Sequence, residues 1–501
     1  MSKIPKQKQY VVLMPAAASL VALVVYLLTL APTITWKHNG ADSGDLVTAA
    51  FTLGIPHPPG YPLFTLISSL FAHFPFVEPA RGVGLFVAFC GAVAVWILAR
   101  AGATLLAPLR SNPFMVWIAP LAALGFALAP ALWSQATIVE VYTLGLVFVA
   151  ILLWAMVSDH PKRIPIAAAA LGLGLAHHLS IIFFLPGAWL VLKPTQRDWR
   201  AGLLVLAPLL FYAYLPLRAL AHPPVNWGNA STLDGFMWEV TGGPYRSYFL
   251  NESLGDALSR VQYTARLLFD QFTPVGLGLA LWGLWRLVQD RGRLALALGL
   301  SAFLVTVYAI VYVSVDSYVY LLYAFAVVLL WLMVGAADLV AQLRAAPLRW
   351  GVVALLAILP VYNLIANYSN MDLSGDQDAM NYARSIIDPT PHSAVLFADG
   401  DNALFAVTYY RQVIVPAQTR VVIVSQGLLQ FDWYYREVQY QMAAESFQPV
   451  QWTDDVTRRA ESIVDAAMAT NRTICFSPSS PALNAYNYTS YNGMYCVTAR
   501  K

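Results

Sequence analysis

Charged residues are scarce in this 501-residue chain, making up 11% of it, whereas soluble proteins have about 25%. Hydrophobic residues make up 58% of the chain. The net charge is only +3, and the basic residues lie in short clusters between apolar runs, so no extended basic surface is available for nucleic acid. The composition excludes an ordinary soluble protein and a nucleic-acid-binding protein, and it indicates a polytopic α-helical membrane protein in contact with lipids.

Cysteine is also rare, and the sequence shows no internal repeat. Of the three cysteines, Cys90 lies in an apolar run and is expected in a packed core. Cys475 and Cys496 lie in the polar C-terminal tail, where we expect a disulfide if the tail faces an oxidising compartment. No group of acidic or histidine residues has a spacing diagnostic of a metal site.

Long apolar runs are abundant and predict about eleven membrane crossings. The first run follows a basic N-terminus but is too long for a typical signal peptide, so we expect an uncleaved helix. The predicted spans lie near residues 11–32, 82–107, 114–134, 141–158, 164–178, 180–193, 201–217, 274–288, 294–314, 318–340 and 350–367.

The basic residues predict the orientation of the chain. Lys3, the pair Lys162 and Arg163, and the pair Arg291 and Arg293 occupy alternate short loops. Because such loops are normally cytoplasmic, the N-terminus is expected inside and the C-terminal tail outside. A bacterial inner membrane with a periplasmic or extracellular tail is the expected location. In a eukaryote the same topology would place the tail in the lumen of the endoplasmic reticulum.

Two domains are predicted. Residues 1–367 form the transmembrane domain, whose outward loops 33–80 and 218–273 are long enough to carry a site. Residues 368–501 form a soluble α/β domain on the outer face, because their composition is far more polar. This tail contains the strand-like runs "SAVLFADGD", "RVVIVSQ" and "RTICFS", and helical periodicity at 375–388 and 454–470.

The first outward loop contains the segment "ADSGDLVTAAFTLGIPHPPGYPLF", residues 41–64. Asp42 and Asp45 lie one turn apart if a helix begins at Ser43, and the apolar residues after them form one stripe of a helix at the membrane surface. Helix capping explains one acid but not the other. Acidic residues at membrane depth are costly, so we predict a catalytic or ion-binding role. His57 follows in a proline-rich turn, where capping of a nearby carbonyl is the simpler role.

This loop resembles the first external loop of membrane glycosyltransferases of the GT-C fold, which use polyprenyl-phosphate sugars. The strings "ATIVEVYTL", "PPVNWGNASTLDGFMWEVTGGPYR" and "DGDNALFAVTYYRQV" extend the resemblance along most of the chain. They are similar to the DUF2723 family, which is related to the eukaryotic transmembrane protein that O-mannosylates receptor domains. This chain has Asp45 where many members have Glu.

The resemblance implies inverting transfer of a monosaccharide from a polyprenyl phosphate to an outward hydroxyl. Such a reaction needs a carboxylate base, Asp42 or Asp45, and cations near the departing phosphate. It implies no metal and no cofactor besides the lipid-linked donor. The acceptor could be a Ser or Thr of a secreted protein, or an envelope glycan or lipid. A transporter or flippase is an alternative, but it would predict inverted repeats and charges near the bilayer centre.

Substrate-binding candidates lie in the outward segments. Arg218 ends a predicted span and His222 follows it, so both could hold the donor phosphate. Each candidate type also has a simpler role. An arginine can anchor a helix end, aromatic residues can form a belt at the membrane interface, a histidine can cap a helix, and a glutamate can form an ion pair. The remaining candidates are His57, Trp227, Tyr245, Arg246, Glu140 and His178.

Overall fold

The computed structural model describes residues 6–109, 111–193, 199–249 and 254–501, so Lys3 lies outside the described residues. The chain divides into two compact units, each assembled from separated stretches. The helical unit comprises Met1–Leu30, Gly84–Phe211 and Tyr245–Ser374, and the mixed unit comprises Ala31–Val83, Tyr212–Pro244 and Gly375–Lys501. The whole first outward loop, 33–80, and residues 218–244 of the second therefore group with the C-terminal tail.

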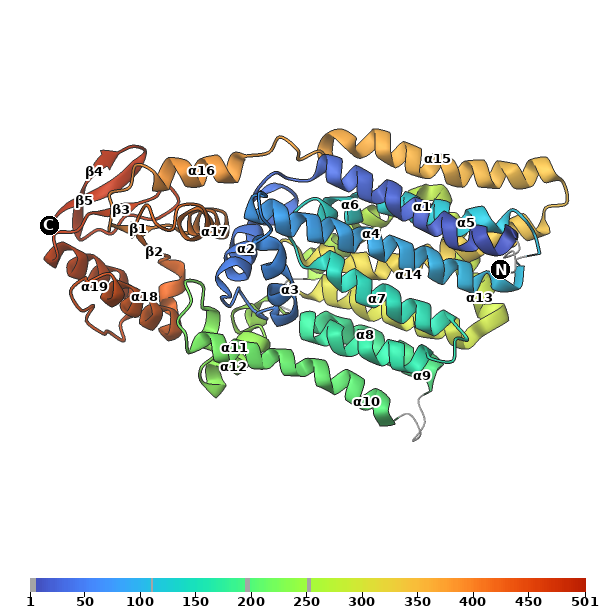
Figure 1. The fold of residues 1–501 in the computed structure, drawn as a ribbon, viewed down its shortest axis with the longest axis horizontal. Helices are drawn as coiled ribbons and strands as arrows, with labels where there is room; N and C mark the ends of the chain where they lie inside the picture. The colour runs from blue at the N-terminus through green and yellow to red at the C-terminus, as the bar shows by residue number, and fades with distance from the viewer. Residues whose placement is uncertain (1–5, 110, 194–198, 250–253) are drawn as a thin grey trace. The chain divides into compact units, whose positions relative to one another are not determined.

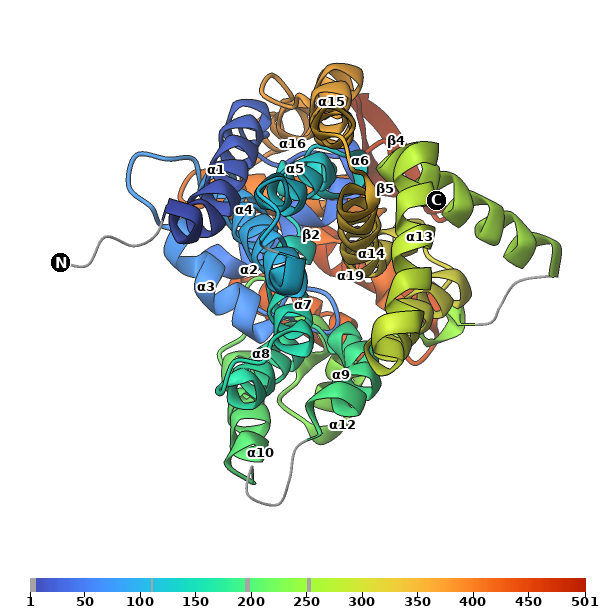
Figure 2. The same cartoon turned by 90° about the vertical axis from the view of Figure 1, so that its right-hand side faces the viewer.

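The helical unit consists of long apolar helices, since only a helix pairs all of its own backbone groups in lipid. In Figure 1, α4, α7 and α14 run in nearly the same direction, and Figure 2 shows α14 among α5, α7 and α13, which it contacts. The helices of this unit are α1 (Lys6–Thr29), α4 (Pro79–Leu105, in this unit from Gly84), α5 (Met115–Ala127), α6 (Pro130–Ala136), α7 (Tyr142–Val157), α8 (Arg163–His177), α9 (Leu185–Leu192), α10 (Trp199–Leu206), α13 (Leu254–Val311), α14 (Leu321–Gln342) and α15 (Ala346–Met371).

Six helices in the described part of the chain are long and apolar enough to cross a membrane, or seven if the bent pair α5 and α6 is one span. The predicted count of about eleven includes the shorter apolar helices α7, α8 and α9. It also divides α13, whose backbone leaves the helical conformation at Thr273 and Arg291. The number of crossings therefore stays a prediction.

Apolar side chains on the outer helices of this unit remain exposed. Leu20 on α1 is 61% exposed and Ile365 on α15 is 76% exposed. Large exposed apolar surfaces are unfavourable in water, but they are the expected surface of a helix that faces lipid. The length, composition and exposure of these helices together indicate an integral membrane protein.

The mixed unit contains a five-stranded sheet with strand order β2-β1-β3-β5-β4. Strand β1 pairs in parallel with β2 and β3, whereas β5 pairs antiparallel with β3 and β4. The three predicted strand runs contain β1, β2 and β3. The strands are β1 (Val395–Phe397), β2 (Val422–Val424), β3 (Ile474–Phe476), β4 (Tyr486–Tyr491) and β5 (Met494–Arg500).

Helices α18 and α19 pack their apolar faces on the sheet. The stacked rings of Phe397 and Phe476, 4.4 Å apart, join Tyr435 from α18 and Ile463 from α19 in one buried cluster. The helices of the mixed unit are α2 (Ser43–Thr52), α3 (Pro62–Ala72), α11 (Tyr214–Ala219), α12 (Leu233–Val240), α16 (Asp378–Ile387), α17 (Asp401–Tyr409), α18 (Asp432–Ala444) and α19 (Val456–Ala469).

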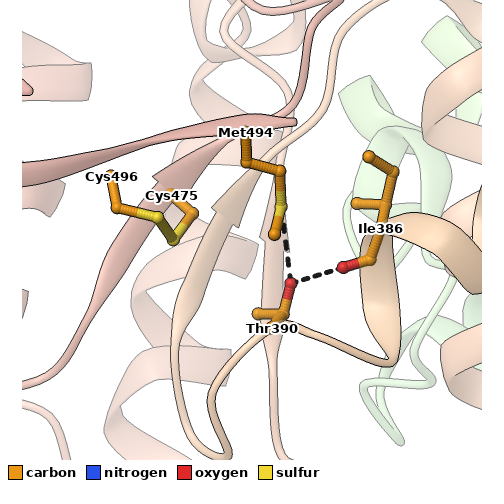
Figure 3. Close-up of a disulfide and its surroundings, with 5 residues drawn as sticks. All are labelled: Ile386, Thr390, Cys475, Met494 and Cys496. Carbon is orange, nitrogen blue, oxygen red and sulfur yellow. Dashed lines mark hydrogen bonds between the residues drawn. A yellow bond between two sulfur atoms is a disulfide. The ribbon is translucent and has the colours of Figure 1, made fainter. Parts of the chain in front are cut away.

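A disulfide between Cys475 and Cys496 joins the neighbouring strands β3 and β5 (Figure 3). Near it, the Thr390 hydroxyl donates a hydrogen bond of 2.6 Å to the carbonyl of Ile386 and lies 3.6 Å from the sulfur of Met494. The bridge ties the C-terminal hairpin to the parallel part of the sheet.

Candidate functional site

The acidic motif lies at the start of α2, which is held in place by a close approach to α17. Asp42 ends a short 3-10 helix, η1 (Lys37–Asp42), and Asp45 lies in the first turn of α2. Between them, Gly44 has no room for a side chain, because a Cβ atom there would lie 2.5 Å from the backbone oxygen of Phe405. Glycine therefore lets α2 pack directly against the backbone of α17.

A short backbone pairing brings the second outward segment beside the first. The amide of Ile55 donates to the carbonyl of Val225 at 2.8 Å, and the amide of Trp227 donates to the carbonyl of Ile55 at 3.2 Å. This pairing places the Trp227 side chain over α2, where its Nε1–H donates to Oδ1 of Asp45 at 3.2 Å. Two segments far apart in the sequence thus meet at one carboxylate.

His57 lies between the two aspartates. Its backbone N–H and its ring Nδ1 are both 2.8 Å from Oδ2 of Asp45. Its Nε2 atom lies 3.3 Å from the Tyr61 hydroxyl and 3.5 Å from Oδ2 of Asp42. The turn that aims these groups requires a left-handed backbone at Gly60 (φ 81°) and at Tyr61 (φ 39°), a conformation that is costly for tyrosine.

The two aspartates have different surroundings. The Asp45 side chain is 2% exposed and accepts hydrogen bonds from the His57 amide, the His57 ring and Trp227, so its orientation is fixed. The Asp42 side chain is 29% exposed. It caps no backbone N–H of α2, although it occupies the N-cap position. Asp42 is the more accessible carboxylate, and Asp45 is the anchored one.

Glu239 is a third acid near this pair. It is fully buried on α12, and neither of its carboxyl oxygens has a hydrogen-bond partner among the described residues. The carboxyl group lies against two glycines with positive φ, Gly60 and Gly228, at which a Cβ atom would come within 3.2 Å and 2.8 Å of its oxygens. Burial, above all, raises the pKa of Glu239 well above its ordinary value, while His57 opposes this shift and Asp45 adds to it.

A second polar group is centred on Glu437 of α18. Its carboxylate lies 3.0 Å from Nδ1 of His222 and accepts a hydrogen bond of 3.2 Å from Nδ2 of Asn226. The His222 ring also stacks on Tyr440, with ring centroids 4.0 Å apart. Burial raises the pKa of Glu437, and its hydrogen bonds and the charge of His222 oppose that rise. The structure therefore gives His222 a carboxylate partner.

Arg218 contacts the C-terminal end of α2. Its Nε–H donates to the carbonyl of Leu53 at 2.6 Å, and one of its terminal nitrogens donates to the carbonyl of Thr52 at 3.3 Å. Leu53 has the left-handed conformation common at helix C-termini. A guanidinium at this end of a helix also interacts favourably with the helix dipole.

The four other predicted residues belong to the helical unit. Glu140 is buried between α6 and α7, and Arg246 and Tyr245 lie in an exposed 3-10 turn, η7 (Gly243–Tyr248). His178 accepts a hydrogen bond from the amide of Ser180 through Nδ1, and its Nε2 lies 3.2 Å from the hydroxyl of Tyr320. These contacts occur within the helical unit.

No group of three or more acidic, histidine or cysteine side chains is arranged to hold a metal ion among residues 6–109, 111–193, 199–249 and 254–501. The site brings together two carboxylates and an imidazole in line, beside a buried carboxyl group. Such an arrangement suits proton transfer.

Solved structures reveal the relationship of the fold. ArnT from Cupriavidus metallidurans in its apo state aligns with a TM-score of 0.56 at 15% identity, covering 96% of this chain and 97% of that chain. The same protein bound to undecaprenyl phosphate aligns with a TM-score of 0.59 at 14% identity, with the same coverage. This chain has the ArnT fold. The ArnT likeness extends over nearly the whole of both chains, and at this identity it concerns the fold alone.

Sequence comparisons add more specific relatives to the ArnT likeness. The family model described as the protein O-mannosyl-transferase TMEM260 N-terminal domain matches residues 42–199, and that of TMEM260-associated domain 2 matches residues 379–492. Protein O-mannosyl-transferase TMEM260 of Mus musculus is 26% identical over 487 residues, covering 87% of this chain and 66% of that protein. The Dictyostelium discoideum protein of the same name is 22% identical over 477 residues, covering 82% of this chain and 57% of that protein. The match thus spans 66% of the length of the mouse relative and 57% of that of the Dictyostelium relative.

Several residues at the site escape sequence reasoning. Glu239 and Glu437 lie in segments whose strings are distinctive, "FMWEVTGG" and "DWYYRE", but nothing in their spacing pairs them with the first loop. Phe405 reaches the site only through the contact of α17 with α2. For Glu239 the sequence does offer one indication of a functional role, because this acid lies in a short and otherwise largely apolar helix.

Proposed function

We propose that this chain is an inverting glycosyltransferase that moves a monosaccharide from a polyprenyl-phosphate donor to a hydroxyl on the extracytoplasmic side of the membrane. The ArnT fold and the relatives named protein O-mannosyl-transferases support this proposal. ArnT bound to undecaprenyl phosphate supports a polyprenyl-phosphate donor. The names of the relatives favour a protein hydroxyl as acceptor and mannose as the sugar.

The observation that carries the proposal is the row formed by Asp42, His57 and Asp45. In it, the accessible Asp42 accepts the proton of the incoming hydroxyl as the oxygen attacks the anomeric carbon. The bond from that carbon to the phosphate oxygen breaks at the same time, and the lipid phosphate leaves with the bonding electrons. Inversion follows because bond formation and bond cleavage occur on opposite faces of the sugar.

Within this proposal, His57 and Asp45 orient and support Asp42. The His57 Nδ1–H donates to Asp45, so Nε2 is directed towards Tyr61 and Asp42. A proton taken up by Asp42 can move on to Nε2, and the resulting imidazolium is stabilised by the anchored Asp45 carboxylate. Asp42 is then ready for another acceptor.

The departing phosphate requires positive charge, and we assign this role to Arg218, which belongs to the same unit as the two aspartates. The contacts of Arg218 with α2 use two of the five N–H donors of its guanidinium group. Arg246 belongs to the helical unit, and its role in phosphate binding stays a prediction from the sequence. His222 is better suited to holding Glu437, because the carboxylate lies 3.0 Å from its ring.

The test is turnover of a radiolabelled polyprenyl-phosphate mannose by the purified full-length chain, with a Ser/Thr-rich peptide as acceptor. We expect Asp42→Asn to lower kcat by about 10²- to 10⁴-fold, the usual contribution of a general base. Asp45→Asn should also lower kcat but leave the KM for the donor nearly unchanged, because Asp45 acts through His57.

A surface acid of the mixed unit, Asp454, provides the matched control. Asp454→Asn should retain wild-type turnover, which shows that loss of one carboxylate does not by itself disable the protein. Full turnover in both Asp42→Asn and Asp45→Asn would remove the proposed site. Turnover by neither the wild type nor any variant, with several donors and acceptors, would remove the proposed activity.

A further inference from the structure

An open-sided cavity of about 70 Å³ lies within the mixed unit, directly beside Asp45. Its walls come from three stretches of the chain: α2, the segment Pro224–Trp227, and the C-terminal part with Phe405, Trp433 and Glu437. We propose that this cavity binds a neutral pyranose ring. This inference rests on the proposed glycosyl transfer and names the substrate group that the cavity would hold.

Aromatic residues line the cavity. The centroids of Trp227 and Trp433 lie 5.7 Å apart, and Phe405 lies 6.3 Å from Trp227. Both tryptophans are only half-buried, so part of each ring remains available. The C–H groups on one face of a pyranose form an apolar surface, and a flat, electron-rich indole is the side chain that covers such a surface best.

The cavity is also lined by polar groups that suit hydroxyls. Glu437 is 4% exposed and already accepts hydrogen bonds from Asn226, with His222 beside it, so its carboxylate is held in one orientation. A carboxylate has about four acceptor positions, which leaves capacity for a pair of neighbouring hydroxyls. Two further polar atoms of lining residues, the acceptor Asn226 Oδ1 and the donor Trp433 Nε1, are buried and have no partner among the described residues.

The charge of the cavity argues against a phosphate as the occupant. Asp45 and Glu437 are the ionisable acids among its lining residues, and none of these lining residues is Lys or Arg. An anion there would meet two carboxylates, each with a histidine beside it but with no lysine or arginine among the lining residues, whereas a neutral sugar would meet acceptors for its hydroxyls. The lipid phosphate must be held elsewhere.

The position of the cavity connects a bound ring with the reaction. Trp227 lines the cavity and also donates its Nε1–H to Asp45 at 3.2 Å. A sugar ring stacked on Trp227 would therefore lie close to Asp45, which in turn contacts the His57 ring. Two sources of a pyranose fit this position: the sugar transferred from the donor, and a sugar already attached to the acceptor.

Direct binding to the full-length chain in detergent tests the inference. The probe is methyl α-D-mannopyranoside, observed by saturation-transfer NMR, with inorganic phosphate as the competing anion. We expect wild-type protein to bind the mannoside, and Trp433→Ala and Glu437→Gln to bind it about tenfold more weakly, as expected for loss of a hydrogen bond to a charged group or of a stacking surface. The control Trp452→Ala, at an exposed tryptophan of the mixed unit outside the cavity, should bind like wild type. If Trp433→Ala does not fold, Trp433→Phe, which keeps an aromatic ring at this position, is measured in its place.

Steady-state kinetics then separates the two sources of the sugar. A raised KM for the lipid donor in Glu437→Gln, with the acceptor KM unchanged, assigns the cavity to the transferred sugar, and the reverse assigns it to a sugar on the acceptor. Mannoside binding that is equal in the wild type, Trp433→Ala and Glu437→Gln would overturn the inference, as would binding of phosphate instead of mannoside. The binding measurement does not require turnover, so the two proposals can fail separately. If the wild type has no transferase activity but binds mannoside, and Trp433→Ala weakens this binding, only the proposed function is rejected.

Discussion

Replacing Glu239 with glutamine should flatten the dependence of stability on pH. Its carboxyl group is fully buried and has no hydrogen-bond partner among the described residues, and burial raises its pKa. An acid with a raised pKa binds its proton more tightly in the folded than in the unfolded protein. Its contribution to stability is thus complete below the unfolded pKa, about 4.3, and is lost as the pH rises through the folded pKa.

The magnitude follows from this linkage. Between the two pKa values, the free energy of unfolding should fall by about 1.4 kcal/mol for each pH unit because of this one group. For a unit of about 200 residues, that corresponds to a decrease in Tm of roughly 3–6 °C per pH unit. In Glu239→Gln this part of the slope should disappear. The amide adds donors without acceptors, so the variant should be less stable than the wild type by about 1–3 kcal/mol at low pH, where Glu239 is protonated. This deficit should shrink as the pH rises, because only the wild type loses stability through Glu239.

Thermal unfolding of the purified chain in detergent, followed at half-unit steps from pH 5 to pH 8, measures the slope. Other ionisable groups near Glu239, which are Asp45 and His57, are present in both proteins, so the difference between the two curves isolates Glu239. Glu445→Gln, at a partly exposed carboxylate 4.0 Å from Arg420, is the matched control and should keep the wild-type slope. Parallel curves for wild type and Glu239→Gln would refute the reasoning, because they would mean that Glu239 is ionised in the folded protein.

Three further outcomes are expected. Gly44→Ala should lower the stability by about 1–3 kcal/mol, measured as a decrease in Tm, because its Cβ atom would meet the backbone of α17 at 2.5 Å; an unchanged Tm would show that the two helices can separate. Trp227→Phe should lower kcat by about tenfold, since it removes a hydrogen bond to the charged Asp45; wild-type kcat would show that this bond is dispensable. Cys475→Ala with Cys496→Ala should cost about 3 kcal/mol for a sequence separation of 21 residues, measured by unfolding under non-reducing conditions; equal stability would mean that the hairpin is held by packing alone.

Much of the local structure can be read from the sequence. The segments with clear periodicity or unbroken apolar runs correspond to α2, α16, α19 and β1 to β3, because each buries a face set by its own residues. The proline-rich turn after α2 and the proximity of Asp42 and Asp45 also follow from local rules. Thus one stretch of about twenty residues supplies the core of the candidate site.

What the sequence does not reveal are contacts between distant segments. The pairing of Ile55 with Asn226 uses backbone groups, which leave no pattern of residue types. The burial of Glu239 depends on the two glycine turns that close over it. The position of Phe405 likewise depends on how α17 packs against α2, which no periodicity specifies. For the same reason, sequence reasoning assigns both outward loops to the transmembrane domain, although residues 33–80 and 218–244 group with the tail.

The assembly of the mixed unit from three stretches has a consequence for biosynthesis. The Thr35 hydroxyl donates to the carboxylate of Asp376, 341 positions later in the chain. At about 5–20 residues per second, a ribosome needs roughly 20–70 s to cover that distance. During this interval the early segment is already translated while its partner is not yet made. A premature stop codon just before β1 would therefore yield a chain with every residue of the acidic motif but without the wall against which α2 packs.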